Sequence, residues 1–274
     1  MSSLLSRKKD LDNKGRIQKI TPKLAGWKYV GFEVYILRSG ESLKQLTGIR
    51  EVCLVLVSGK ANFKTIHNSW KNLGERLTIF GIESFAKGTP PSALYIPDHD
   101  EFVVEALTDI ELAVCSAPGL GNFPARLIKP EDMTYETRGN GTNTRHVCNI
   151  LPETADADNL LVVEVLTPNG NWSSYPPHKH EADNLPLESS LEETYYYRLN
   201  PPQGFAFQRI YTDDLSLDET ITVQNYDVVM VPRGYHPVGA PHGYDLYYLN
   251  VMAGAKRIWK FQNDPKHEWI IEKN

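Results

Sequence analysis

The chain has 274 residues, of which 41% are hydrophobic and 23% charged, so it can bury a core and form one large or two modest domains. This composition excludes an intrinsically disordered protein. The net charge of −5 and the lack of any basic tract exclude the electrostatic footprint of a nucleic-acid binder.

Strand signals dominate the chain, because runs of β-branched and aromatic residues alternate with Gly, Pro, Asn and Asp. In chain order we expect strands within residues 28–40, 50–63, 76–81, 93–107, 110–118, 146–151, 160–168, 193–199, 204–212, 221–232 and 244–254. No long segment has clean helical periodicity. The pattern therefore predicts an all-β sandwich or barrel.

Two pairs of segments suggest a duplicated β unit. The segment "REVCLVLVSGKANF" has the same strand–turn–strand plan as "EETYYYRLNPPQGFAF", and "SALYIPDHDEFVVEA" resembles "DVVMVPRGYHPVGAP". Because both pairs occur in the same order, we expect two homologous barrels. The boundary should fall in the polar, glycine-rich stretch 135–146, which gives domains 1–134 and 135–274.

The cellular location of the protein is predicted from the targeting signals and cysteine patterns that the sequence lacks. The N-terminal apolar patch is too short for a signal peptide, and no stretch approaches the roughly 18–20 apolar residues of a membrane span. Three scattered cysteines, Cys53, Cys115 and Cys148, imply no disulfide framework. We expect a cytoplasmic protein that binds neither nucleic acid nor membrane.

The stretch "YPPHKH" carries the strongest chemical signal. On a strand, residues i and i+2 point to one face, so His178 and His180 project together as a chelating pair requires. Glu193 opens a later strand, and His236 follows a Pro-x-Gly turn. Three imidazoles and a carboxylate suit Zn²⁺, Fe²⁺, Mn²⁺, Co²⁺ or Ni²⁺. The alternatives are two solvated loop histidines, and His242 in place of His236.

These motifs resemble those of the cupin superfamily, in which H-x-H and a later Glu precede a glycine-turn histidine. The 12 residues between His180 and Glu193 exceed the usual spacing and leave Glu192 as a rival ligand; we favour Glu193, which stands directly before the aromatic strand.

Longer stretches, including "RGNGTNTRHVCNILPE" and "VPRGYHPVGAPHGYDLYYLNVMAG", resemble the bacterial 5-deoxy-glucuronate isomerase family of myo-inositol catabolism. The resemblance implies a bicupin of two tandem jelly-roll barrels. The N-terminal barrel would be degenerate. The C-terminal barrel would hold one divalent metal per chain, with zinc expected before Mn, Fe, Co or Ni, on the ligand set His178, His180, Glu193 and His236. The implied reaction is the aldose–ketose isomerisation of 5-deoxy-D-glucuronate to 5-dehydro-2-deoxy-D-gluconate.

Such a reaction by proton transfer needs a general base near the metal, whereas a hydride shift does not. The candidate bases are Glu192, Asp183, Asp245 and Tyr247, although Glu192 should face away from Glu193 by strand alternation. For the substrate carboxylate, the best guanidinium partners are Arg145 and Arg233. Hydroxyl contacts to the sugar could come from a set of tyrosines, of which most are expected to pack in barrel walls: Tyr175, Tyr195, Tyr197, Tyr235 and Tyr247.

Rival functions share the same residues. A related isomerase of 5-dehydro-4-deoxyuronate would differ only in its pocket, and an Fe(II) cupin dioxygenase would use the same ligand set. A non-enzymatic sugar-binding bicupin would usually lack a complete set. The partner we expect is a sugar acid, and homo-oligomers are plausible for a protein with exposed edge strands.

Overall fold

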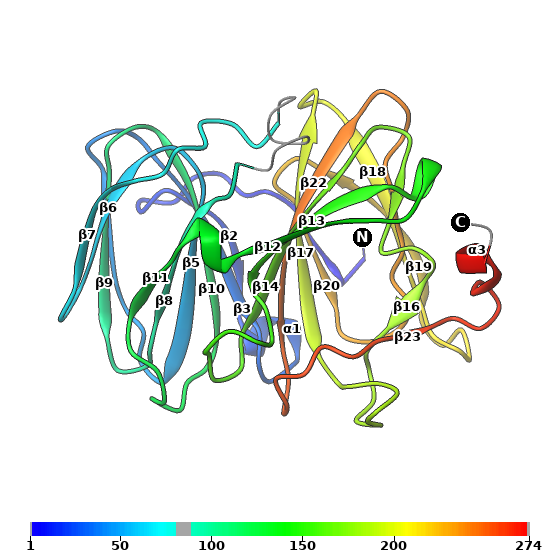
Figure 1. The fold of residues 1–274 in the computed structure, drawn as a ribbon. Helices are drawn as coiled ribbons and strands as arrows, with labels where there is room; N and C mark the ends of the chain where they lie inside the picture. Colours follow the sequence, from blue (N-terminus) through cyan, green and yellow to red (C-terminus); the bar gives the residue numbers. More distant parts are fainter. Residues whose placement is uncertain (1, 81–88, 273–274) are drawn as a thin grey trace. The chain divides into compact units, whose positions relative to one another are not determined.

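The computed structural model describes residues 2–80 and 89–272 (Figure 1). These residues form two compact units. The N-terminal unit comprises residues 9–134 and 148–162, and the C-terminal unit comprises residues 1–8, 135–147 and 163–274. None of the described helices is long and apolar enough to cross a membrane.

The N-terminal unit contains β2 (Arg16–Ile20), β3 (Gly31–Leu37), β4 (Ser42–Leu46), β5 (Arg50–Ser58), β6 (Ala61–Thr65), β7 (Ser69–Leu73), β8 (Ser92–Ile96), β9 (Glu101–Ala106), β10 (Ile110–Pro118) and β11 (Arg126–Ile128), with the short helices α1 (Pro22–Ala25) and η1 (Pro130–Asp132). Its strands form a six-stranded sheet, β11-β8-β5-β10-β3-β2, and a four-stranded sheet, β4-β9-β6-β7. Alternate residues of the nine-residue β5, Val52, Leu54 and Leu56, join the core formed with residues of β4, β6 and β9.

The C-terminal unit contains β1 (Leu5–Ser6), β15 (Trp172–Ser173), β16 (His178–Lys179), β17 (Glu192–Asn200), β18 (Phe205–Tyr211), β19 (Asp218–Gln224), β20 (Val228–Val231), β21 (Val238–Gly239), β22 (Asp245–Ala253) and β23 (Gln262–Asn263), with η2 (Gly141–Asn143) and α3 (Trp269–Glu272). Three further strands have residues in both units: β12 (Thr134–Arg138), β13 (Arg145–Leu151) and β14 (Leu161–Thr167).

The same strand plan occurs twice. The order β8-β5-β10-β3-β2 corresponds to β20-β17-β22-β14-β13, and the order β4-β9-β6-β7 corresponds to β15-β21-β18-β19. In both copies a nine-residue strand of the larger sheet, β5 or β17, is followed by a turn and a strand of the smaller sheet, β6 or β18. This repetition confirms the predicted all-β fold of two cupin-type barrels.

The grouping into units differs from the division predicted after residue 134 in two segments. Residues 1–8 belong to the C-terminal unit, where β1 pairs with β20. Residues 148–162 belong to the N-terminal unit, where the Glu51 carboxylate accepts the backbone N–H groups of residues 158–160. The strand predicted at 76–81 is also wrong over its described residues 76–80, which form no strand. The side chain of Arg76 is buried there and donates a hydrogen bond to the carbonyl of Val57. Residue 81 lies outside the described residues.

Candidate metal centre

Three buried side chains of the C-terminal unit converge on one point. His180 directly follows β16, Glu193 is the second residue of β17, and His236 lies between β20 and β21. One ligand atom from each lies within 4.8 Å of the others, and no side chain is more than 3% exposed. Among the described residues this is the only such group of three or more His, Cys, Asp or Glu.

Backbone carbonyls fix the orientation of both imidazoles. His180 Nδ1 lies 3.1 Å from the carbonyl oxygen of Leu191, and His236 Nδ1 lies 2.8 Å from that of Gly234. Because a carbonyl oxygen only accepts, each Nδ1 must carry the hydrogen. In the neutral rings each Nε2 then presents a lone pair, which is the arrangement typical of metal-binding histidines.

Both Nε2 atoms face the same carboxylate oxygen. The Oε2 atom of Glu193 lies 3.0 Å from His180 Nε2 and 3.3 Å from His236 Nε2. The buried Nε2 of His236 has no hydrogen-bond partner. Burial would raise the pKa of Glu193, but the contacts with His180 and His236 outweigh it and lower this pKa to about 2. A carboxylate and two imidazole nitrogens at these distances need positive charge between them. A proton on Nε2 of His180, whose pKa is lowered by burial but raised overall by Glu193, meets that need, and a divalent metal fits the same donor set.

His178 borders this cluster. Its ring centroid lies 4.9 Å from that of His236 and 6.5 Å from that of His180, and Phe261 packs on it at 4.6 Å. Burial, with the neighbouring His236 and His180, holds the pKa of His178 well below its ordinary value. The ring is therefore neutral and keeps a lone pair, as a fourth ligand requires.

The long gap between His180 and Glu193 forms an anchored loop. The Glu188 carboxylate accepts the backbone N–H groups of Glu181 and Ala182, and the Leu191 N–H donates to the His180 carbonyl at 3.0 Å. The loop therefore returns to β17 beside the histidine pair, and the unusual spacing does not separate His180 from Glu193.

The structure distinguishes the rival ligands. Glu193 faces the two imidazoles, so its neighbour Glu192 points to the other face of β17. His236 is 1% exposed, whereas His242 is exposed in the turn between β21 and β22.

The candidate bases lie away from the cluster. Glu192 faces the opposite side of the sheet. Asp245 pairs with Asn200, seven residues along β17 from Glu193, which is about 23 Å at roughly 3.3 Å per residue. Its carboxylate accepts the backbone N–H of Asn169. The Tyr247 hydroxyl donates to the Glu164 carboxylate at 3.0 Å, on the face opposite Tyr248. Asp183 is exposed and pairs with Lys256 at 3.6 Å.

Two adjoining cavities meet the cluster. The outer cavity has a volume of about 580 Å³ and the inner one about 30 Å³. Both are lined by Arg138, Arg145 and His178. Glu193 is the only acidic side chain among the described residues that line them. The two cavities therefore share a wall that contains two arginines, and the inner cavity reaches Glu193 of the cluster.

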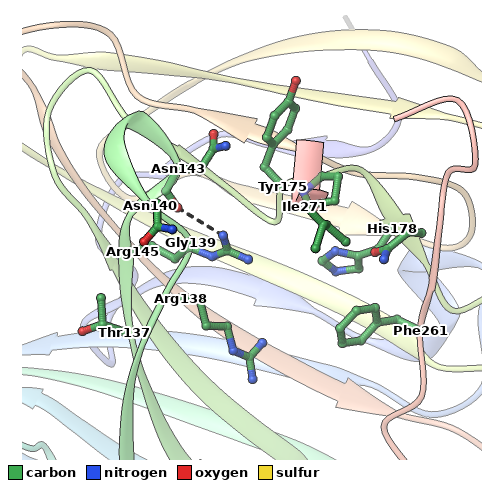
Figure 2. A pocket seen from close by; sticks show the side chains of 12 residues that line it. Thr137, Arg138, Gly139, Asn140, Asn143, Arg145, Tyr175, His178, Phe261 and Ile271 are labelled. Carbon is green, nitrogen blue, oxygen red and sulfur yellow. Dashed lines mark hydrogen bonds between the residues drawn. The ribbon is translucent and has the colours of Figure 1, made fainter. Parts of the chain in front are cut away.

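Figure 2 shows the Arg138 and Arg145 guanidinium groups on one side of the outer cavity, with His178 and Phe261 on the other. The Arg145 Nη1 donates to the Asn143 carbonyl at 3.1 Å, and Tyr175 also lines the cavity. The structure brings Arg145 and Tyr175 to the site.

It does not bring Arg233 or Tyr235 there. Arg233 is exposed near Ser216, and the Tyr235 hydroxyl donates to the Asp213 carboxylate at 2.9 Å. Neither residue lines the two cavities.

Several lining residues carried no signal in the sequence. Arg138, Ser174, Tyr248, Asn250 and Trp259 all line the inner cavity. Arg138 lies in the glycine-rich stretch 135–146, which we expected to be a domain boundary. Its guanidinium lies over the ring of Trp259, a residue of the C-terminal segment. That segment returns to the site because β23 pairs with β16, placing Asn263 opposite His178 (Figure 1).

The fold and the cluster together define a bicupin with a candidate metal centre in its C-terminal barrel. The oxalate decarboxylase of Lactobacillus farciminis has a similar fold. It superposes with a TM-score of 0.66 at 12% identity, covering 97% of this chain and 90% of its own. That likeness concerns the fold alone.

The chain belongs to the KduI/IolB family, whose model matches residues 4–270. A relative from Geobacillus thermodenitrificans, named 5-deoxy-glucuronate isomerase, is 56% identical over 99% of this chain and 97% of its own length. The crystal structure of an IolB-like protein from Salmonella typhimurium superposes with a TM-score of 0.93 at 51% identity, covering 98% of this chain and all of its own.

Proposed function

We propose that this protein is a metal-dependent isomerase that converts 5-deoxy-D-glucuronate to 5-dehydro-2-deoxy-D-gluconate in myo-inositol catabolism. The observation that carries the proposal is that Glu193 of the buried His and Glu cluster lines the inner cavity together with two guanidinium groups, those of Arg138 and Arg145. The 56% identity to a relative named 5-deoxy-glucuronate isomerase, over 99% of this chain, supports the same reaction.

The metal would be held by His178, His180, Glu193 and His236, with zinc the expected ion. When bound, it supplies positive charge that stabilises negative charge developing on the substrate oxygens. The backbone carbonyls of Leu191 and Gly234 hold two of the imidazoles in the required tautomer before any ion arrives.

The carboxylate of the sugar acid would bind Arg145 and Arg138. Burial, with the nearby positive charge of Arg138 among its lesser causes, lowers the pKa of Arg145, although a guanidinium stays charged at neutral pH. Glu136 neutralises Arg138 from one side, at 2.5 Å. An anion between the two guanidiniums would relieve their repulsion and gain charge-assisted hydrogen bonds. A cavity of about 580 Å³ has room for a six-carbon sugar acid.

The test is conversion of 5-deoxy-glucuronate by purified protein of known metal content, in anaerobic buffer, with ketose formation followed by NMR. We expect conversion without oxygen, and loss of metal and activity in the His180→Ala variant. Conversion that requires oxygen would favour the dioxygenase. Activity only on 5-dehydro-4-deoxyuronate would favour the related isomerase. Activity without any metal would refute the role of the cluster.

A further inference from the structure

The inner cavity is polar and small enough to hold one oxygen group of a ligand. Its volume is about 30 Å³, close to that occupied by one water molecule. Besides the proposed metal ligands and the two arginines, it is lined by three hydroxyl groups, those of Ser174, Tyr195 and Tyr248. Asn250 and Trp259, which also line it, offer N–H donors, and these three hydroxyls are its O–H donors.

Ser174 holds the hydroxyls together from an unusual backbone conformation. Its φ of +49° lies in the left-handed region, which non-glycine residues rarely adopt. The residue is 6% exposed, and its Oγ lies 3.1 Å from the Tyr195 hydroxyl and 3.4 Å from the Tyr248 hydroxyl. Because glycine would adopt this conformation without strain, a serine here indicates that the hydroxyl contacts to Tyr195 and Tyr248 are needed.

The hydroxyl trio has a hydrogen to spare. Ser174, Tyr195 and Tyr248 carry three O–H hydrogens, and their two mutual contacts use two of them. Ser173 adds one more contact to Tyr248 and one more O–H hydrogen, which leaves the balance unchanged. One O–H therefore remains for a further acceptor. Burial raises the pKa of Tyr248 above its ordinary value, so the phenol is protonated at neutral pH and can donate.

Tyr248 is well placed for that donation. It lies on β22 on the same face as Asn250, which also lines the inner cavity, and its ring packs 5.0 Å from Tyr195 and 5.9 Å from Tyr197. This packing fixes the ring, so the hydroxyl is held in place before a ligand arrives, as an effective oxyanion donor requires.

We propose that Tyr248, positioned by Ser174, donates a hydrogen bond to the substrate oxygen that becomes negatively charged during isomerisation. The inference rests on the proposed function, because the isomerisation of a sugar acid creates that charge next to the aldehyde carbon. It assigns Tyr248 to catalysis and Ser174 to positioning, whereas Glu192, Asp245 and Tyr247 face elsewhere.

The test compares Tyr248→Phe with the matched variant Tyr197→Phe. Both changes remove a buried phenol hydroxyl from one aromatic cluster, but the Tyr197 hydroxyl donates to the Gln208 side chain at 2.8 Å and lines neither cavity. Loss of one oxyanion donor lowers kcat by roughly 100- to 1,000-fold. We expect about a 100-fold fall in kcat for Tyr248→Phe with unchanged KM and metal content, and less than a threefold change for Tyr197→Phe.

Ser174→Gly tests the positioning role. Glycine adopts a positive φ without strain, and this gain offsets part of the cost of losing two buried hydroxyl contacts, so the variant should fold and melt within a few degrees of wild type. We expect its kcat to fall about tenfold despite that stability, with KM and metal content unchanged. A purely structural serine would give a variant of full activity.

The outcomes separate this inference from the proposed function. If wild type makes no ketose, the proposed function fails and the inference with it. If wild type is active and Tyr248→Phe keeps kcat within threefold, or loses no more than Tyr197→Phe, only the inference is overturned.

Discussion

Replacing His236 by alanine should weaken metal binding by about 100-fold. Four ligands share a binding free energy that for structural zinc sites is roughly 10–16 kcal/mol, or about 3 kcal/mol per ligand. Since about 1.4 kcal/mol corresponds to a factor of ten, one lost ligand costs about two orders of magnitude. The buried Nε2 of His236 has no hydrogen-bond partner and lies 3.3 Å from the Glu193 carboxylate, so alanine removes a donor without breaking a side-chain hydrogen bond at that atom.

His242→Ala is the matched control, because it removes an exposed histidine of the same unit that sequence spacing alone could not exclude. The assay is competition with a chromophoric chelator, with metal content measured after dialysis. We expect the affinity of the His242 variant to match wild type. An unchanged affinity in His236→Ala, or a large loss in His242→Ala, would refute the assignment of the ligands.

The remaining predictions concern the walls of the site, the first barrel and the C-terminal segment. Arg145→Gln should raise KM for the sugar acid about 10- to 100-fold, the worth of a lost charge-assisted hydrogen bond, while the exposed Arg233→Gln leaves it within twofold; steady-state kinetics decide between them. Glu51→Ala should lower the free energy of unfolding by about 4 kcal/mol, because three backbone N–H groups and the Tyr95 hydroxyl lose their acceptor. Glu51→Gln keeps one acceptor oxygen and should cost about half as much. Urea titrations measure both variants, and equal losses would contradict this explanation. Ser189→Ala should cost about 1.5 kcal/mol and speed proteolysis of the C-terminal segment, since this hydroxyl bonds to the backbone of Ile258 and Lys260; an unchanged cleavage rate would count against that anchoring role.

Strand and turn patterns predicted an all-β sandwich or barrel, and the two pairs of similar segments, which include the nine-residue strands β5 and β17, predicted two homologous barrels. They were not enough to place every side chain. Glu51 has the same position in β5 as Glu193 has in β17, yet it lies on the face of β5 opposite Val52 and Leu54, which pack in the core. A shift of one residue in alignment moves a side chain to the other face, and no local pattern reports that shift.

The sequence predicted the residues that form the His and Glu cluster and the neighbouring His178, but among the other residues that line the two cavities it pointed only to Arg145, Tyr175 and Tyr195. Chelation requires particular residue types at short spacing, so the pair His178 and His180 can be recognised in the sequence. Arg138 and Arg145 flank a stretch whose glycines and asparagines suggested a linker; the structure instead makes it a hairpin between β12 and β13, with Gly139 at φ +74°. Ser174 is distinguished only by its φ. A cavity wall is assembled from distant segments by strand register, and its chemistry becomes visible only when that register is known.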